Sequence, residues 1–258
     1  VDLIHSTNFK LELDDPEVGG LTAYQAVIWR SPGLPLSIRS VIDQRLIQRD
    51  KSFINSGYAK HPYMSYKDYQ SAEIETNIPE INTPKTIIIP DVKNATFKYL
   101  ESTIGLPFIV KPTNLSRGRG VEKIQDEASL REYLKDKDLR EIIFQEFVPN
   151  DGDYRVILVG YKVVGVMKRI PAPGHFRANI SRGGHGEHIL DEKFLSEITP
   201  IAEKIAKYFE LELVGLDFMK YQDRIILIEI NSIPQFQGFE KITGINVVQK
   251  LLEYLKTR

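Results

Sequence analysis

The chain has 258 residues, of which 42% are hydrophobic and 27% are charged, and its formal net charge is −1. This composition is ordinary for a globular protein with one large domain or two to three small lobes, and the near-neutral charge excludes a basic footprint for DNA or RNA. No cysteine is present, which excludes disulfides and thiolate chemistry, and no apolar stretch approaches the ~20 residues that span a bilayer. Without a visible secretory signal, we expect a cytoplasmic protein with no membrane partner.

Hydrophobic periodicity predicts strands and helices that follow one another without regular alternation. Residues 55–70 are polar and aromatic and contain Pro62, which is typical of a linker or exposed segment. The mixture favours α+β lobes over one doubly wound sheet. The predicted strands are 1–4, 26–29, 85–90, 106–111, 141–148, 154–159, 162–170, one that contains Asp217, and 225–230, and the predicted helices are 37–48, 129–139, 192–209 and 247–255.

The C-terminal strand prediction contains an unexpected acidic residue. Residues 225–230 are apolar and β-branched, yet they include Glu229, and Asn231 follows two residues later. Residues two apart on a strand point to the same face. A turn centred on Asp223 places Asp217 directly across from Glu229. Two carboxylates and an amide oxygen then converge.

A buried pair of carboxylates is costly unless a cation neutralises it. Oxygen ligands of this kind suit Mg²⁺ or Mn²⁺, and Mg²⁺ usually bridges to phosphates. The alternative interpretation is a surface hairpin with solvated acids. It fits less well, because Glu229 interrupts an otherwise apolar strand.

A lysine at the end of a predicted strand precedes a glycine-containing loop. Lys111 ends the strand 106–111, and the loop contains Gly118 and Gly120. Glycine lets backbone N–H groups approach phosphate oxygens. A glycine-rich hairpin turn and a strand-end lysine that reaches for solvent are the alternative interpretations. Together, the lysine and the loop favour nucleotide phosphate binding.

The segment 168–184 gathers four cations among loop-forming residues. Arg177 and Asn179 alternate on an extended stretch, and Arg182 precedes two glycines. Guanidinium groups suit carboxylate and phosphate oxygens. A solvated basic loop is the alternative. Asp153 and Arg155 flank Tyr154 at the start of the strand 154–159, and we expect them to face the same cavity.

The histidines form no metal-ligating set with cysteine. His185 and His188 lie in a glycine-rich stretch without matching partners. We therefore expect them to be exposed loop residues and expect no zinc site.

The order of these motifs resembles the ATP-grasp superfamily from about Ala26 to the C-terminus. The motifs are Lys111, the glycine loop, Gln-Glu-Phe-Val, Asp-x-Arg, Phe-Arg-Ala-Asn-Ile-Ser-Arg-Gly-Gly, Gly-Leu-Asp and Glu-Ile-Asn. Residues 176–184 and 239–246 are similar to the RimK-type branch of glutamate and amino-acid ligases. The resemblance implies an α+β ATP-grasp fold with two lobes that clasp ATP. It places a partial Rossmann-like N-terminal lobe at 1–60, a small central lobe at 61–148 and a C-terminal lobe with the metal site at 149–258.

The resemblance also implies roles for individual residues. Lys111 and Lys67 match lysines that contact ATP phosphates, although a surface lysine in a polar segment is the alternative for Lys67. Asp153 matches a group near the ribose, and Arg155 and Arg182 are expected to hold the substrate carboxylate. The remaining assignments are Gln145, Glu146, Phe147 and Val148 at the hinge beside adenine, Arg177 and Asn179 around the terminal phosphate and the acyl-phosphate, and Asp217, Glu229 and Asn231 as magnesium ligands.

The sequence departs from the family pattern in two places. Such ligases begin with a β-α unit that this chain lacks, so we expect an incomplete N-terminal lobe. The family pattern after the last metal ligand is Asn-x-x-Pro-Gly, and here Gln235 replaces the glycine. That loop borders the acceptor side, so the departure concerns substrate identity more than ATP chemistry.

These features predict an ADP-forming carboxylate–amine ligase that uses ATP with Mg²⁺ or Mn²⁺. Its expected reaction adds a glutamate-like amino acid to a peptide, protein or small-molecule acceptor through an acyl-phosphate, and a homo-oligomer is compatible with the sequence. One alternative is a ligase that forms lactams or lactones on a precursor peptide. Others are a nucleotide-binding regulatory module without turnover and a kinase that acts on a small alcohol.

Overall fold

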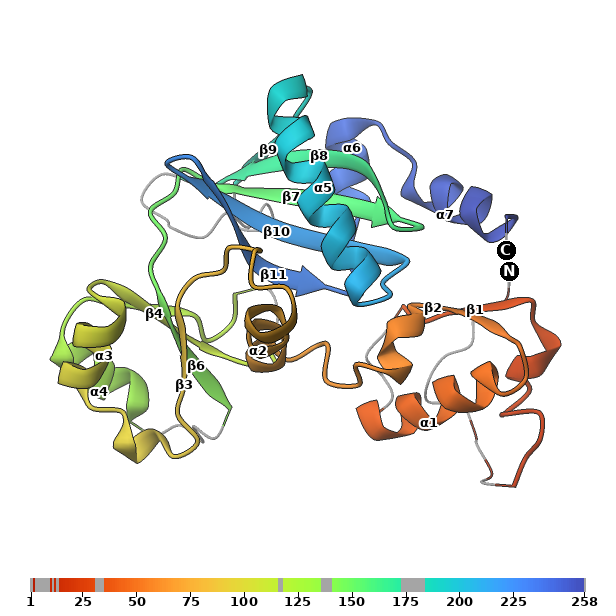
Figure 1. The fold of residues 1–258 in the computed structure, drawn as a ribbon, viewed down its shortest axis with the longest axis horizontal. Helices are drawn as coiled ribbons and strands as arrows, with labels where there is room; N and C mark the ends of the chain where they lie inside the picture. The colour runs from red at the N-terminus through yellow and green to blue at the C-terminus, as the bar shows by residue number, and fades with distance from the viewer. Residues whose placement is uncertain are drawn as a thin grey trace.

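The structure is a computed structural model that describes residues 2, 10, 12, 14–30, 35–115, 118–135, 141–172 and 184–257. Its strands form a parallel pair and two antiparallel sheets, which divide the chain into an N-terminal unit, a small lobe and a large lobe (Figure 1). Apart from Asp2, the predicted strand at 1–4 lies outside the described residues, as do the segments 116–117, 136–140 and 173–183.

The N-terminal unit consists of two parallel strands and one helix. The pair aligns Ile28 with Ile54. The helix buries Ile42 and Leu46, four residues apart on one face, against the strand residue Phe53. The elements are the 3₁₀ helices η2 (Leu21–Ala23) and η3 (Ser56–Ala59), the strands β1 (Ala26–Ile28) and β2 (Ser52–Ile54), and the helix α1 (Leu36–Ile47).

The small lobe has one face covered by helices and one face turned toward the large lobe. Its strand order is β3-β6-β4-β5. Phe108 and Val110 of β4 alternate into the core under α3 and α4, so Ile109 and Lys111 belong to the opposite face. The elements are β3 (Thr86–Ile88), η4 (Val92–Asn94), α3 (Phe97–Ile104), β4 (Phe108–Pro112), β5 (Glu122–Ile124), α4 (Glu127–Leu134) and β6 (Ile142–Glu146).

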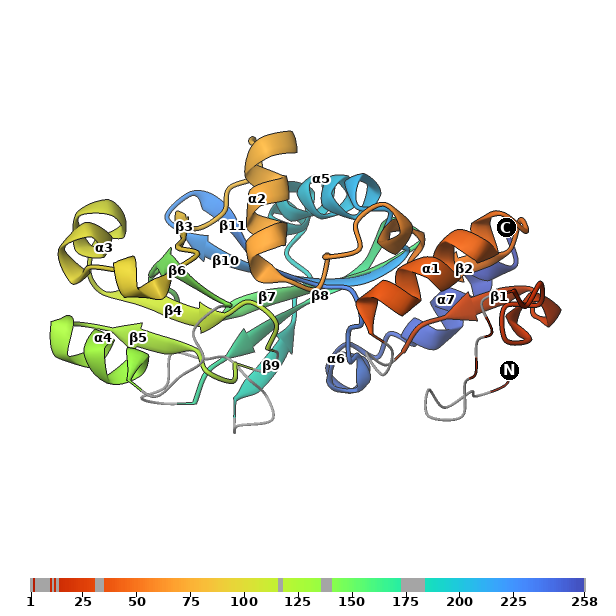
Figure 2. The same ribbon diagram turned by 90° about the horizontal axis from the view of Figure 1, so that it is seen from below.

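The large lobe is a five-stranded sheet with the order β11-β10-β7-β8-β9. Helix α5 covers one face, and α6 and α7 cover part of the other (Figure 2). Gly165 of β8 permits this second contact, because a Cβ there would lie 2.6 Å from Ile245 and 2.9 Å from Phe239. The elements are β7 (Asp153–Val159), β8 (Lys162–Ile170), β9 (His185–His188), α5 (Glu192–Tyr208), β10 (Leu213–Tyr221), β11 (Arg224–Asn231), α6 (Gln237–Thr243) and α7 (Val247–Leu255).

Two predictions of local structure are wrong. Residues 55–70 are not a linker or exposed segment, because they contain η3 and the first turn of α2 (Lys67–Asn77), and Tyr58 and Met64 in this stretch are buried. His185 and His188 lie at the ends of β9, which pairs with β8, rather than in a loop. Helix α2 lies between the two lobes in the centre of Figure 1.

Candidate functional site

The hairpin of β10 and β11 brings the predicted acidic residues together. Asp217 pairs directly with Glu229, and Gly215 pairs with Asn231. The turn lies between Tyr221 and Arg224, which alone would place Asp217 across from Ile228. A bulge on β11 shifts the register by one residue and restores the pairing of the two carboxylates.

Protein cations balance both carboxylates in this structure. Asp217 is almost fully buried and accepts two hydrogen bonds from Arg155, one of them 2.7 Å long from Nε to Oδ1. Arg169 Nη2 lies 2.9 Å from Asp217 Oδ2, and Arg169 also donates to Asp153. Burial alone would raise the pKa of Asp217, but Arg155 and Arg169 outweigh it and hold that pKa at about 2.

Glu229 has a different neighbour, which comes from α2. Its Oε1 lies 3.4 Å from Lys67 Nζ, and about a third of the Glu229 side chain is exposed. Lys67 also donates from Nζ to the carbonyl of Leu115 at 2.6 Å and from its backbone N–H to the carbonyl of Thr113 at 3.1 Å. Lys67 therefore connects the end of β4 in the small lobe with β11 in the large lobe.

Lys111 is a buried cation without a close anionic partner among the described residues. Only 6% of the residue is exposed, and no carboxylate described in the structure lies within 4.0 Å of its ammonium group. Burial lowers the pKa of Lys111 to about 8, with Glu229 opposing this effect and Lys67 adding to it. The neighbouring Thr113 hydroxyl is also buried without a hydrogen-bond partner in the described part of the chain. The end of β4 therefore carries two polar groups whose bonding capacity is not used.

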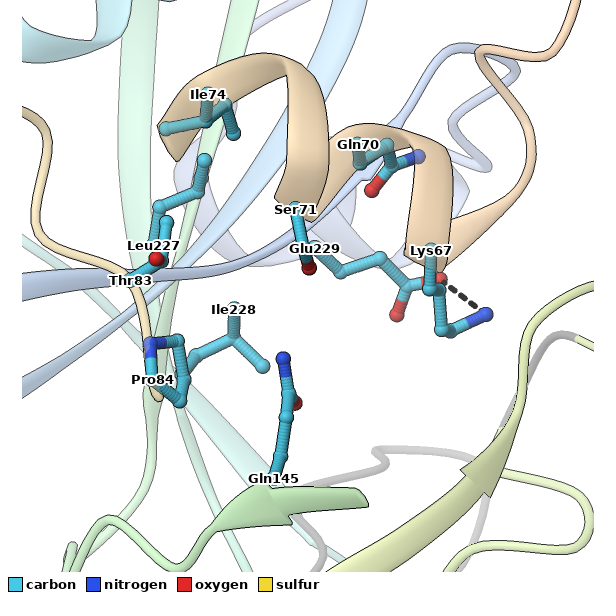
Figure 3. Close-up of a pocket in the computed structure, with 10 residues that line it drawn as sticks. All are labelled: Lys67, Gln70, Ser71, Ile74, Thr83, Pro84, Gln145, Leu227, Ile228 and Glu229. Carbon is cyan, nitrogen blue, oxygen red and sulfur yellow. Dashed lines mark ion pairs between the residues drawn. The ribbon is translucent and has the colours of Figure 1, made fainter. Parts of the chain in front are cut away.

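A pocket lies between the lobes beside these residues. Figure 3 shows Lys67 and Glu229 turned toward each other and Gln145 rising from the small lobe. The bulge residue Ile228 lies in the same wall. The lining residues are Lys67, Gln70, Ser71, Ile74, Thr83, Pro84, Gln145, Leu227, Ile228 and Glu229.

The predicted hinge residues extend from β6 toward the large lobe. Gln145 Nε2 donates to Thr86 Oγ1 at 2.8 Å, and the Glu146 N–H donates to the carbonyl of Lys85 at 3.0 Å. Lys123 Nζ lies 3.9 Å from the centre of the Phe147 ring. Val148 is buried.

The other predicted site residues have these positions. Asn231 Oδ1 accepts a hydrogen bond from the N–H of Ile233 at 3.2 Å. Asp153 and Arg155 both lie in the charged cluster around Asp217, where their side chains are engaged with Arg169 and Asp217. The predictions for Arg177, Asn179 and Arg182 fall outside the described residues.

Sequence reasoning missed several residues that the structure places around the site. Arg169 completes the cluster at Asp217, and the cation-rich segment 168–184 was its only signal. Gln70 and Asn55 contact the backbone beside Asn231, and no sequence pattern indicated either one. Within the described ranges, no three His, Cys, Asp or Glu residues form a group that would hold a metal by themselves. The helices described in the structure include none with the length and apolar character needed to cross a membrane.

The lobes, the inter-lobe pocket and the acidic hairpin define the ATP-grasp class of α+β folds. A solved RimK domain ATP-grasp protein from Sphaerobacter thermophilus superimposes with a TM-score of 0.68 at 14% identity, over 97% of this chain and 87% of the other. D-alanine–D-alanine ligase from Bacillus anthracis, complexed with ATP, has a TM-score of 0.67 at 14% identity, over 95% and 84%. The ATP-grasp ligase PsnB, complexed with a minimal precursor, has a TM-score of 0.64 at 19% identity, over 86% and 70%.

A model of the RimK-like ATP-grasp domain matches residues 59–255. The chain therefore belongs to the RimK-like ATP-grasp family, and the predicted fold class and family are confirmed. A probable alpha-L-glutamate ligase of Picosynechococcus sp. is 34% identical over 162 residues, 61% of this chain and 52% of that protein. A protein of the same name from Pasteurella multocida is 32% identical over 170 residues, 64% and 51%. The chain spans about half the length of these curated relatives.

Proposed function

We propose that the chain catalyses ATP-dependent ligation of a carboxylate to an amine, with ADP as product. Lys111 is the observation that carries this proposal. A buried ammonium group without an anionic partner is costly, and a nucleotide phosphate would supply the missing anion. The Thr113 hydroxyl, which has no hydrogen-bond partner among the described residues, and the glycine-containing loop that follows fit the same ligand.

The acidic hairpin fits a magnesium or manganese ion. Asp217, Glu229 and Asn231 offer carboxylate and amide oxygens on two paired strands, and these are the ligands that hard cations prefer. Bound there, the ion would neutralise charge on the phosphates. Glu229 is more accessible than Asp217, since about a third of the Glu229 side chain is exposed.

The proposed reaction has two steps. A substrate carboxylate oxygen attacks the γ-phosphorus of ATP, the bond to the β–γ bridging oxygen breaks, and an acyl-phosphate and ADP form. The nitrogen of an amine then attacks the acyl carbon, phosphate leaves with the electrons of the C–O bond, and the nitrogen loses a proton to give an amide. Lys111 and Lys67 would hold the phosphates, and Gln145 to Val148 and Asp153 would bind adenosine.

The basic segment completes the proposed machinery. Arg177 and Asn179 would stabilise the transferred phosphoryl group, and Arg155 and Arg182 would hold the substrate carboxylate. Because the curated relatives are named alpha-L-glutamate ligases, we propose a glutamate-like amino acid as one substrate and a peptide, protein or small molecule as acceptor. We further propose that the protein acts in the cytoplasm.

A second candidate is a ligase that modifies a precursor peptide, which the structural likeness to PsnB in complex with its precursor supports. Mass spectrometry of the product separates the two. Loss of water from a single peptide indicates an internal lactam or lactone, whereas amino-acid ligation adds mass. A module that binds ATP and releases no ADP with any substrate would contradict both.

A further inference from the structure

Two buried side-chain amides hold the backbone on either side of Asn231. They are Asn55, which follows β2, and Gln70 of α2, and only 3% and 5% of these residues are exposed. Both come from the segment that joins the N-terminal unit to the small lobe. Both form hydrogen bonds to the backbone of the large lobe, at or just after the end of β11. Neither has a role in the proposed reaction.

Gln70 completes the hydrogen bonding of an edge strand. Its Oε1 accepts from the N–H of Ile230 at 3.0 Å, and its Nε2 donates to the carbonyl of the same residue at 2.8 Å. Nε2 also donates to the carbonyl of Met64 at 2.7 Å. Because β11 is the outermost strand of its sheet, Ile230 has no neighbouring strand on this side among the strands that the structure describes. The amide of Gln70 takes that place.

Asn55 acts in the same way on the residue after Asn231. Its Nδ2 donates to the carbonyls of Ser232 and Leu213, each at 2.8 Å, and its Oδ1 accepts from the N–H of Leu213 at 2.6 Å. The Tyr58 hydroxyl contacts the Ser232 hydroxyl. Ile230 and Ser232 are therefore both fixed, and Asn231 lies between them.

We infer that Gln70 and Asn55 are positioning residues that set the distance between the oxygens of Glu229 and Asn231, and so the affinity of this pair for a divalent cation. The inference rests on the proposed function. Glu229 and Asn231, which would supply the metal-binding oxygens, are the two chain neighbours of Ile230. Loss of the hydrogen bonds between Gln70 and Ile230 therefore frees the backbone that carries both side chains. Partners of this kind, which orient ligands without touching the metal, typically change metal affinity 10- to 100-fold when removed.

The test is calorimetric titration of Mn²⁺ into the protein saturated with a non-hydrolysable ATP analogue. We expect Gln70→Leu to weaken Mn²⁺ binding by about 10- to 100-fold. Nucleotide binding in EDTA should change less than about threefold, because the side-chain hydrogen bonds of Gln70 go to the backbone of Met64 and Ile230 and not to a proposed nucleotide contact. The matched control is Ile78→Val, which removes one buried methylene just after the end of α2 and leaves the hydrogen bonds between Gln70 and Ile230 in place. It should bind Mn²⁺ as the wild type does.

If Gln70→Leu shows no cooperative unfolding transition and is therefore not folded, Gln70→Glu is measured in its place. This variant keeps an acceptor for the N–H of Ile230 and loses the amide donors, so its Mn²⁺ affinity should fall between those of the wild type and Gln70→Leu. If either folded Gln70 variant binds Mn²⁺ as tightly as Ile78→Val, the inference is wrong while the proposed function stands. If the wild type with the analogue binds no Mn²⁺, the proposed function itself is contradicted, and the inference with it.

Discussion

Asp217 and Glu229 face each other across β10 and β11, yet their charges are balanced by different cations from different elements. Arg155 of β7 and Arg169 of β8 hold Asp217, and Lys67 of α2 lies beside Glu229. Asp217 is thus fixed within its own sheet, whereas Glu229 is linked to the junction of the two lobes. The two carboxylates should therefore respond differently to mutation.

Asp217→Asn should lose turnover and also destabilise the fold by about 3–5 kcal/mol, because Arg155 loses its anionic partner and the buried Arg169 keeps only Asp153. Glu229→Gln should lose turnover at a cost on the order of 1 kcal/mol, because Glu229 is partly exposed and its lysine keeps a carbonyl partner. Urea unfolding of both variants without ligands measures the contrast. If the two variants had equal free energies of unfolding, the expected difference between the buried Asp217 and the partly exposed Glu229 would be wrong.

The cluster also predicts a dependence on acid. The pKa of Asp217 lies near 2 in the folded protein and at 3.8 in the reference state, so its contribution to stability is complete above pH 4 and is lost as the pH falls toward 2. The difference in free energy of unfolding between wild type and Asp217→Asn should shrink over this range. A difference that stays constant from pH 5 to pH 2.5 would contradict the assignment.

The charge of Lys111 should destabilise the fold, whereas the charge of Asp217 stabilises it. Its pKa is about 8 when folded and 10.5 in the reference state, so the unfolded state binds more protons between these values and the stability of the wild type rises with pH there. Lys111→Met should therefore be more stable than the wild type at pH 7, by a difference on the order of 2 to 3 kcal/mol, and should lose this advantage by about pH 10.5.

The same variant should lose nucleotide-dependent turnover while remaining folded. Unfolding in urea at pH 7 and 9.5 measures the first effect, and ADP release measures the second. Lys98→Met, on an exposed part of α3, is a suitable control, because a solvated lysine should change neither measurement. Parallel pH profiles for wild type and Lys111→Met would contradict the burial of this lysine away from the carboxylates of the described residues.

Metal removal gives an independent prediction. Excess EDTA should abolish ADP release, and added Mg²⁺ or Mn²⁺ should restore it, because the proposed oxygen donors need a hard cation to bring them together with phosphate. Calcium, which favours longer bonds and more ligands, should restore much less. Turnover that persists in EDTA would remove the metal from the proposed mechanism.

The pairing of the acidic hairpin was predictable because it follows from local periodicity, whereas the two lobes were implied by the resemblance to the ATP-grasp superfamily. Once the position of the turn near Asp223 is predicted, the residue that pairs with Glu229 on the other strand is defined to within one position. The bulge at Ile228 was not predictable, since one extra residue leaves the strand pattern unchanged. It decides, however, that Asp217 faces Glu229.

Helix α2 was missed for a different reason. Its buried stripe is Lys67, Gln70 and Ile74, which has helical spacing but only one apolar member. Lys67 and Gln70 are buried because distant carbonyl and carboxylate groups bond them, and such partners cannot be read from a single sequence. Strand β9 was missed likewise, because His185 and Glu187 are exposed on an edge strand and carry no apolar pattern.

The most direct test of the central claim is ADP release from Mg–ATP in the presence of single amino acids, with glutamate among them and AMP followed in parallel. We expect ADP and phosphate to appear together when the right carboxylate and amine are present, and we expect Lys111→Met to abolish both. The appearance of AMP instead of ADP would contradict an acyl-phosphate mechanism and the function proposed for this site.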